Sequence, residues 1–199
     1  MITCLTGPIT HIEQNSITLM VGPMGLQVHV PTSHFFHLKE TTTLWTYMHW
    51  NQEQGPALYG FQTELDKTTF LLIISCNGIG PKIGLTAIAQ LGSNAFLQAI
   101  TENNAKALSN ISGIGAKKAE QIIVQLKHKV QKLIASGVSF EGAQSAQQLQ
   151  ELQEVLASLN YSRKEIDAAC NWLSDKHKGD AVTFDLLMRQ ALSFLAKKA

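Results

Sequence analysis

The sequence predicts a multidomain protein of mixed α and β class, with an N-terminal β-barrel, a central all-α domain and a small C-terminal helical domain. Three observations predict this order. Short β-rich runs alternate with turn residues over residues 1–63, and the apolar period becomes helical over residues 64–140. A segment rich in Gly, Ser, Ala and Gln, expected to be a flexible linker at residues 141–150, then precedes three helical patterns in residues 151–199.

The first domain is expected to be a small antiparallel barrel. Its β-rich runs are separated by turn residues, with one hairpin turn at residues 22–25 and another at 51–56. The runs cover residues 16–21, 26–30, 42–50 and 57–61. Oligonucleotide-binding barrels are built at this scale, so an OB-fold is predicted.

This first domain carries little charge. It holds one lysine, Lys39, against the three acids Glu13, Glu40 and Glu53, whereas charged residues make up about 25% of an ordinary soluble domain. Two explanations are open: self-association covers much of this surface, or the exterior is simply neutral and rich in Thr and Gln. The whole chain is nearly neutral, with 16 basic and 15 acidic residues.

The central domain is predicted to be helical and basic. An apolar face runs from Leu65 to Cys76, and further helices are expected over residues 81–91, 95–100, 104–108 and 116–134. Ser93 or Asn94 is the expected N-cap of the 95–100 helix. Residues 64–140 hold eight lysines against four acids, a net charge of plus four.

Two glycine-containing motifs in this basic domain repeat thirty-five positions apart. They read NGIGPK at residues 77–82 and SGIGAK at residues 112–117, and each lies between two predicted helices. The repeat extends further, because Gln90 and Gln125 stand at the same offset. The sequence therefore predicts two helix-hairpin-helix units that share one core.

A Gly-Ile-Gly turn before a helix suits the binding of phosphate. Glycine lets a foreign backbone approach, the intervening Ile should point inward, and the unpaired N–H groups of the next helix attract anions. Pro81 suits the first helical position, and the lysines add positive charge. The predicted DNA-binding residues are Asn77, Gly78, Ile79, Gly80, Lys82, Gly113, Ile114, Gly115, Lys117 and Lys118.

Other interpretations of the glycines are weaker. A dinucleotide site is disfavoured because Gly78, Gly80 and Gly84 are spaced G-x-G-x-x-x-G and follow a predicted helix, not a strand. The simplest alternative is that the glycines only end one helix and start the next. Since both copies carry a lysine two residues after the second glycine, a nucleic-acid backbone is the favoured ligand.

Residues 151–199 are predicted to form a small three-helix, UBA-like domain. Fewer than fifty residues make a small and marginal core. Such a module on a tether is expected to dock a partner, with a stabilising appendage as the alternative.

Over essentially the whole chain the sequence resembles the RuvA family, the Holliday-junction-binding subunit of the bacterial branch migration complex. The similarity lies in VGPMGLQVHVP at residues 21–31, LYGF at 58–61, the two glycine motifs, and the residues Lys117, Lys118, Ala119 and Glu120. It implies a homotetramer, or an octamer, whose basic face holds an open four-way DNA junction in recombination and repair. It also implies that residues 151–199 recruit RuvB, a hexameric ATP-driven motor.

The resemblance also implies an acidic pin at the junction centre, which falls on Glu53. Gln54 stands where the family usually has a second acid, so one carboxylate should repel phosphate about half as strongly as two. The alternative is that Glu53 is an ordinary solvated loop acid. Ala116 and Gln121 replace residues that are often basic, and Asn160 replaces a turn glycine, which Asn tolerates well.

No active site is predicted in this chain. It lacks the G-x-x-x-x-G-K-[ST] phosphate loop, so a motor would have to be a partner. A helix-hairpin-helix DNA glycosylase or lyase would need a catalytic acid after a hairpin, and residues 64–140 contain only Glu64, Asp66, Glu102 and Glu120.

A single-strand-binding barrel is the remaining alternative. It would stack bases on Trp45, Tyr47 and Trp50. Strand alternation places Trp45 and Tyr47 on one face and Trp50 on the other, so core packing or a subunit contact explains these side chains equally well.

No cofactor or metal is expected. Cys4, Cys76 and Cys170 are widely separated without a C-x-x-C pair, and His34 and His37 lack further ligands nearby. Free cysteines fit a reducing cytoplasm, and neither an export leader nor an apolar run of about 18 residues is visible.

Overall fold

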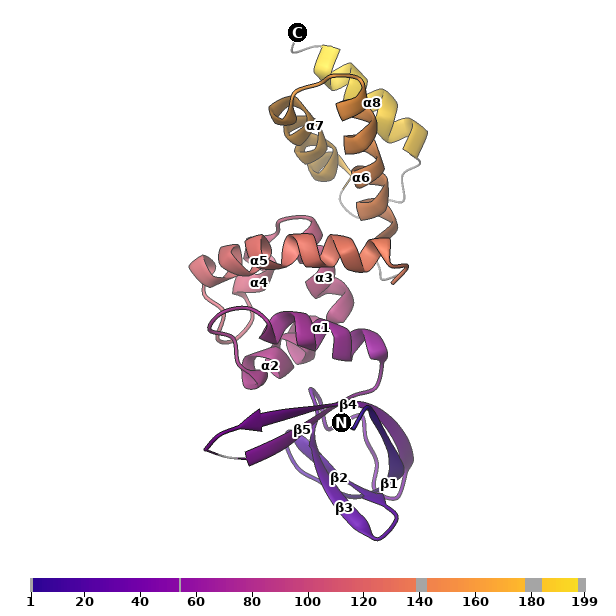
Figure 1. The fold of residues 1–199 in the computed structure, drawn as a ribbon, viewed down its shortest axis with the longest axis vertical. Coiled ribbons are helices and arrows are strands. Elements are labelled where there is room, and N and C mark those ends of the chain that lie inside the picture. The colour runs from indigo at the N-terminus through magenta and orange to yellow at the C-terminus, as the bar shows by residue number, and fades with distance from the viewer. Residues whose placement is uncertain (1, 54, 139–142, 178–183, 197–199) are drawn as a thin grey trace. The chain divides into compact units, whose positions relative to one another are not determined.

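The computed structural model of the 199-residue chain describes residues 2–53, 55–138, 143–177 and 184–196. The chain divides into two compact units, Met1–Lys129 and Val130–Ala199, and each is described by itself (Figure 1). The predicted fold class is confirmed: a five-stranded barrel of OB type comes first, tandem hairpin helices follow, and three further helices end the chain.

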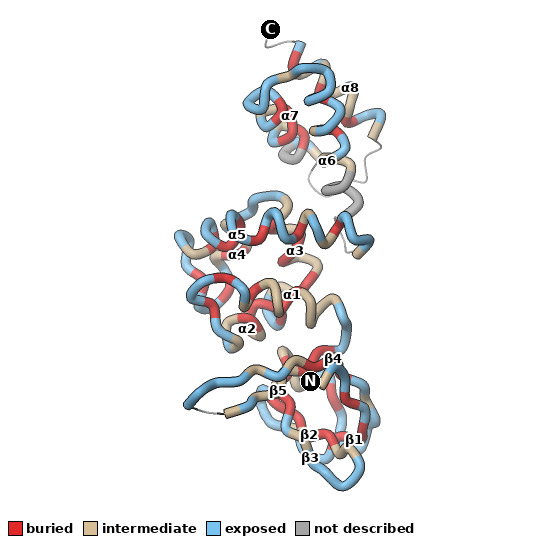
Figure 2. Tube along the Cα trace, in the orientation of Figure 1, coloured by how far each residue is buried: buried red, intermediate tan, exposed pale blue. Residues whose placement is uncertain are grey.

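Five strands form the closed barrel. They are β1 (Cys4–Ile12), β2 (Ser16–Val21), β3 (Met24–His29), β4 (Thr41–Asn51) and β5 (Gly55–Phe61), in the spatial order β1-β2-β3-β5-β4. All pairs are antiparallel except β3 with β5. Buried and exposed residues alternate along β1 (Figure 2), and the core consists of Leu5, Ile9, Ile17, Leu19, Val28, Val30, Phe36 and Leu44.

Strand β1 is absent from the four β-rich runs that the sequence indicated. Gly7 and Pro8 interrupt its apolar pattern, and both residues normally weaken a strand. In the structure, residues from Cys4 to Pro8 pair with β4, and from Ile9 the pairing is with β2. Pro8 therefore lies where β1 changes its partner, a position that only the closed barrel reveals.

An aromatic cluster joins the barrel to α1 (Glu64–Ile74). Phe70 of α1 is fully buried, and its ring centroid lies 4.9 Å from that of Phe61, 5.3 Å from Tyr59 and 6.0 Å from Tyr47. Burial raises the pKa of the Tyr59 hydroxyl, with Tyr47 as a smaller cause. This packing fixes the first hairpin helix on the barrel.

The remaining helices of this unit are α2 (Pro81–Leu91), α3 (Ser93–Thr101), α4 (Ala105–Ser109) and the beginning of α5 (Ala116–Ala135). The expected N-cap of α3 was wrong: Gly92, with φ of 79°, precedes the helix and allows the sharp bend after α2. The Ser93 hydroxyl instead donates a 2.5 Å hydrogen bond to Asp66 Oδ1 of α1.

The N-cap of α4 gives a first testable prediction. The Asn104 side chain accepts a 3.1 Å hydrogen bond from Ala107 N. We expect Asn104→Ala to lower the free energy of unfolding by about 1 kcal/mol, because it leaves that helical N–H without a cap. Chemical denaturation measures the change, and Asn110→Ala, at the exposed other end of α4, is the control that should change little.

The second unit contains α6 (Ala143–Ser158), α7 (Arg163–Lys176) and α8 (Phe184–Ala196). The structure differs from the expected linker at residues 141–150, because residues 143–150 belong to α6, while 141 and 142 lie outside the described residues. Ala and Gln favour helix, so a segment with little apolar periodicity can still extend one. Asn160 adopts the left-handed turn expected of it, with φ of 64°.

The core of this unit is small but continuous. It comprises Leu152, Leu156, Ile166, Ala169, Cys170, Leu173, Leu187, Ala191 and Leu195. Ser162 and Glu165 form a capping box at the start of α7, and the hydrogen bonds from Ser162 lower the pKa of the Glu165 carboxyl.

No single described helix is long and apolar enough to cross a membrane. Helices α2 and α3, which meet at 95°, would together be long and apolar enough, but by length and composition only.

Candidate nucleic-acid interface

The two glycine turns have the same backbone structure. Three backbone hydrogen bonds recur in both copies, with N···O distances of 2.9 to 3.2 Å. In the first copy they run from Cys76 N to Ile73 O, Ile79 N to Cys76 O and Gly84 N to Gly80 O; in the second, from Ile111 N to Leu108 O, Ile114 N to Ile111 O and Ala119 N to Gly115 O. The sequence repeat is therefore a structural repeat.

The isoleucines anchor the turns, as predicted. Ile79 is 6% exposed and Ile114 is 3% exposed, so both point into the core between the hairpins. The residues on either side face outward, namely Asn77, Gly78, Gly80 and Lys82 in the first turn and Gly113, Gly115 and Lys117 in the second. In each turn, a buried isoleucine therefore anchors a backbone that is exposed to solvent.

The two glycines of each turn serve different purposes. Gly78 and Gly113 have φ of 74° and 92°, which other residues rarely adopt. Gly80 and Gly115 do not need such angles, and a Cβ atom built on either one meets nothing within 4 Å. The fold itself thus requires the first glycine, whereas the second leaves open space beside the turn for a foreign backbone.

The helix that follows the first turn begins without a side-chain cap. Gly80 precedes α2 and provides no side-chain cap, Pro81 takes the first helical position as predicted, and neither α2 nor α5 has an acid in its first turn. By contrast, Thr63 caps α1 and Ser162 caps α7, and both of those helices carry first-turn acids. The N–H groups and the positive dipole end of α2 are therefore available to an anion.

The three predicted lysines do not have equal surroundings. Lys82 and Lys117 are exposed at equivalent positions of the two copies. Lys118 is partly buried, and its Nζ donates a 2.8 Å hydrogen bond to Gly78 O. An ammonium group has three donors, so Lys118 fastens α5 to the first turn and keeps donors for a phosphate.

Two glutamines contact the turns, a role that the sequence repeat alone did not reveal. Gln90 of α2 accepts a 2.9 Å hydrogen bond from Ser112 N and donates one of 3.0 Å to Ser112 Oγ. Gln125 of α5 accepts a 3.3 Å hydrogen bond from Asn77 N. Each glutamine therefore holds the turn of the other hairpin.

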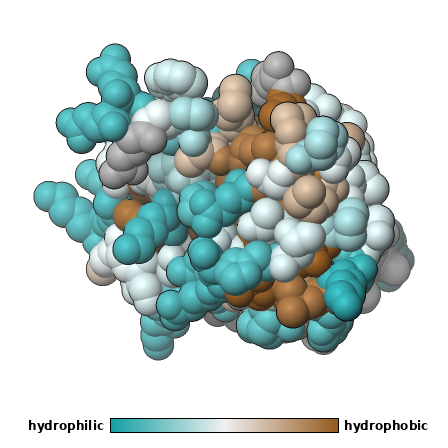
Figure 3. All heavy atoms as spheres, turned by 90° about the horizontal axis from the view of Figure 1, so that it is seen from below, coloured by the Kyte–Doolittle hydropathy of each residue, from teal (hydrophilic) through white to brown (hydrophobic). Residues whose placement is uncertain are grey.

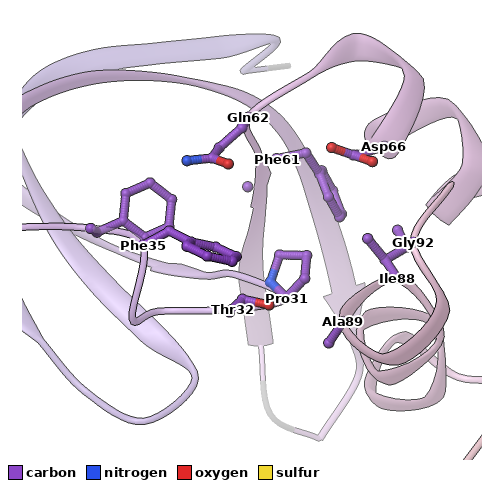
Figure 4. Close-up of a pocket in the computed structure, with 11 residues that line it drawn as sticks. Pro31, Thr32, Phe35, Phe61, Gln62, Asp66, Ile88, Ala89 and Gly92 are labelled. Carbon is purple, nitrogen blue, oxygen red and sulfur yellow. The ribbon is translucent and has the colours of Figure 1, made fainter.

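A separate pocket of about 180 Å³ lies where the barrel meets the helices. Figure 4 shows Phe35 on one side and Ile88, Gly92 and Asp66 on the other. Asp66 already accepts hydrogen bonds from the hydroxyl groups of Thr63 and Ser93. The Asp66 carboxylate of this pocket is therefore already engaged by groups of the protein itself.

Three groups of the helical region that could act as a nucleophile or an acid are buried or hydrogen-bonded within the protein. Burial raises the pKa of the Cys76 thiol, and nearby Lys129 offsets only part of this shift, so the thiol stays protonated near neutral pH. Asp66 accepts the hydrogen bonds described above, and Glu102, the C-cap of α3, accepts a hydrogen bond from the Gln98 side chain. The DNA glycosylase interpretation gains no support from these residues.

The barrel aromatics are divided by strand alternation, as expected. Tyr47 packs toward Phe70, and Lys67 Nζ lies 5.9 Å above the Trp45 ring, so both side chains are engaged by α1. Trp50 is 68% exposed. This arrangement favours packing over a stacking platform for single strands.

Glu53 lies at the tip of the β4–β5 hairpin, which extends from the barrel in Figure 1. Its side chain is exposed, and its backbone N donates a 2.8 Å hydrogen bond to Asn51 Oδ1. Gln54, the predicted departure from a two-acid pin, lies outside the described residues.

Comparison with known proteins shows sequence similarity along the whole chain. Family models match at residues 1–60, as the RuvA N terminal domain, and at residues 70–128, as the SAM-like helix-hairpin-helix tandem. The chain is 34% identical over 199 residues to the Holliday junction branch migration complex subunit RuvA of Exiguobacterium sp.. Proteins of the same name from Geobacter sulfurreducens and Pelobacter propionicus are 32% and 30% identical over 203 and 201 residues.

Each of these three alignments covers 99% of this chain and 100% of the relative. Since the similarity extends through the barrel, both hairpins and the C-terminal helices, the chain belongs to the RuvA family.

Proposed function

We propose that this chain binds four-way (Holliday) junction DNA by its shape, without reading base sequence, as the non-motor subunit of a branch migration complex in homologous recombination and repair. The observation that carries this proposal is the pair of equivalent glycine turns, each exposed and followed by a lysine. Main-chain N–H groups and lysines contact phosphates, which are the same at every base pair. The full-length relatives are named as subunits of such a complex.

Self-association of the barrel would place several such pairs around one junction. The barrel leaves large apolar side chains exposed, namely Met24, Phe35, Leu38, Met48 and Trp50, and apolar surface lies among hydrophilic side chains in the view of Figure 3. Together with its low charge, this surface supports a homotetramer or octamer. Several subunits that engage four arms at once raise the local concentration of binding sites, which linear duplex cannot match.

Glu53 is proposed as the acidic pin of this assembly. A carboxylate on an extended hairpin tip opposes the negative charge of phosphates and helps keep separated strands apart. One acid per subunit provides a weaker repulsion than two.

A competition gel-shift experiment tests the proposed function. A labelled synthetic four-way junction is bound at fixed salt, and unlabelled junction, linear duplex or single strand of equal length is added. The proposal expects junction to compete far better than either other DNA. Preferential competition by single strand would favour the barrel-based binder instead, and release of bases from the DNA would indicate the glycosylase class.

Residues 151–199 are proposed to recruit a RuvB-like ATPase. Removal of residues 143–199 takes away the whole of α6, α7 and α8 without cutting a helix. We expect the shortened chain to keep its affinity for the junction and to lose stimulation of the motor's ATP hydrolysis. Gel shifts and an ATPase assay measure the two properties on the same preparation, and stimulation by the shortened chain would contradict this assignment.

A further inference from the structure

The glutamine contacts of the two hairpins are reciprocal. Gln90 and Gln125 are thirty-five positions apart, and so are their partners Ser112 and Asn77. The helix that leaves the first hairpin therefore holds the second turn, and the helix that leaves the second hairpin holds the first turn. The same amide side chain makes the same type of bond twice, each time to the turn of the other hairpin.

A second pair of contacts obeys the same relation. A Cβ atom built on Gly78 lies 3.8 Å from Lys118 Cε, and one built on Gly113 lies 3.4 Å from Ile83 Cγ1. Ile83 and Lys118 are again thirty-five positions apart. Each turn is thus packed beneath one side chain and bonded by one glutamine from the opposite helix.

These contacts fix the parts of the turns that meet DNA. Asn77 and Ser112 are the first residues of the two motifs, and each is followed at once by a glycine with a positive φ. Backbone hydrogen bonds and the buried isoleucine hold one side of each turn, but the glycine itself is conformationally free. A bond from another helix holds the turn in one conformation and reduces the ordering needed when a phosphate binds.

We infer that Gln90 and Gln125 are positioning residues that hold the two phosphate-binding turns at a fixed separation, so that they engage the DNA backbone as a pair. This inference rests on the proposed function. The shorter distance at Ser112, 2.9 Å against 3.3 Å at Asn77, assigns the larger effect to Gln90.

The test replaces each glutamine with methionine, singly and together. Methionine keeps the length of the side chain and the helix propensity but removes the acceptor oxygen. In the free protein, Gln90→Met should speed amide hydrogen exchange in the second turn, and Gln125→Met should do so in the first. Each variant thus reports on the turn that is distant in sequence.

Junction affinity is then measured over a series of salt concentrations. Gln90→Met should weaken binding by about tenfold and Gln125→Met by about fivefold, and both should make the salt dependence shallower, because fewer phosphates are held. Gln98→Met is the matched control, since it removes a 2.8 Å side-chain hydrogen bond to Glu102 at the C-terminal end of α3, and it should leave both properties unchanged.

The outcomes distinguish a failure of the positioning role from a failure of the proposed function. Parent-like exchange and affinity in the Gln90 and Gln125 variants would overturn the positioning role while the parent still prefers junction DNA. Losses that Gln98→Met reproduces would also overturn it, because they would reflect stability alone. A parent protein without junction preference would instead refute the proposed function.

Discussion

Replacing Lys82 and Lys117 together with alanine is expected to weaken four-way junction binding by roughly two orders of magnitude at 0.1 M salt. Both lysines are exposed and stand at the same place beside the two turns. Each lysine that neutralises a phosphate releases condensed counterions, so losing two per subunit should also flatten the dependence of log K on log salt. Gel shifts or fluorescence anisotropy at four or more salt concentrations measure both effects.

A second pair of lysines provides the control. Lys106 of α4 and Lys127 of α5 are exposed, and Lys127 stands about 15 Å along the helix axis from Lys117. Their double alanine variant has the same change of net charge. It should retain most of the affinity and the parent salt slope. Equal losses in both double variants would show that overall charge, and not the turns, attracts the DNA.

Replacing Gly80 and Gly115 together with aspartate is expected to abolish detectable junction binding without loss of stability. Both positions lie directly before a helix, and neither backbone is in the left-handed region. Aspartate is a better N-cap than glycine by a few tenths of a kcal/mol, so the melting temperature should hold or rise slightly. Its carboxylate would occupy the helical N–H groups and repel phosphate.

The asparagine variants at the same two positions separate these causes. Asparagine caps a helix about as well as aspartate but carries no charge. We expect the asparagine pair to bind more weakly than the parent protein and more tightly than the aspartate pair, with similar melting temperatures for both. Unchanged junction affinity in the aspartate variant would mean that no anion lies at these turns.

The local chemistry of the turns could be predicted because it depends on neighbouring residues only. The proline at the start of α2 and the inward isoleucines follow from short-range rules, and the structure agrees on both. The change from a strand period to a helical one likewise located the barrel and the hairpins. A dinucleotide site was disfavoured because a predicted helix, and not a strand, precedes Gly78.

Contacts between distant elements could not be predicted in this way. The bond from Lys118 to Gly78 O joins residues 40 positions apart, and that from Asn77 to Gln125 joins residues 48 apart. The repeat showed that Gln90 and Gln125 correspond, but only packed helices show which turn each one reaches. The predicted N-cap of α3 was wrong for the same reason, since the Ser93 hydroxyl bonds to Asp66 of another helix.

Strand β1 and the start of helix α6 also could not be predicted, because both depend on tertiary contacts. Strand β1 contains Gly7 and Pro8, and only pairing with two different strands explains how it tolerates them. Helix α6 begins at Ala143, inside a segment whose composition resembled a linker. Its apolar residues beyond the segment, Leu152 and Leu156, are fully buried and give the helix its tertiary support.

The most direct test of the paired turns is amide hydrogen exchange with and without saturating four-way junction. Bound phosphates should slow exchange in peptides that cover both residues 77–83 and 112–118, while peptides from α7 keep their rates. The lysine double variant at equal occupancy should show weaker protection of the same two segments. Unchanged exchange in both turns, with the junction bound, would contradict the account.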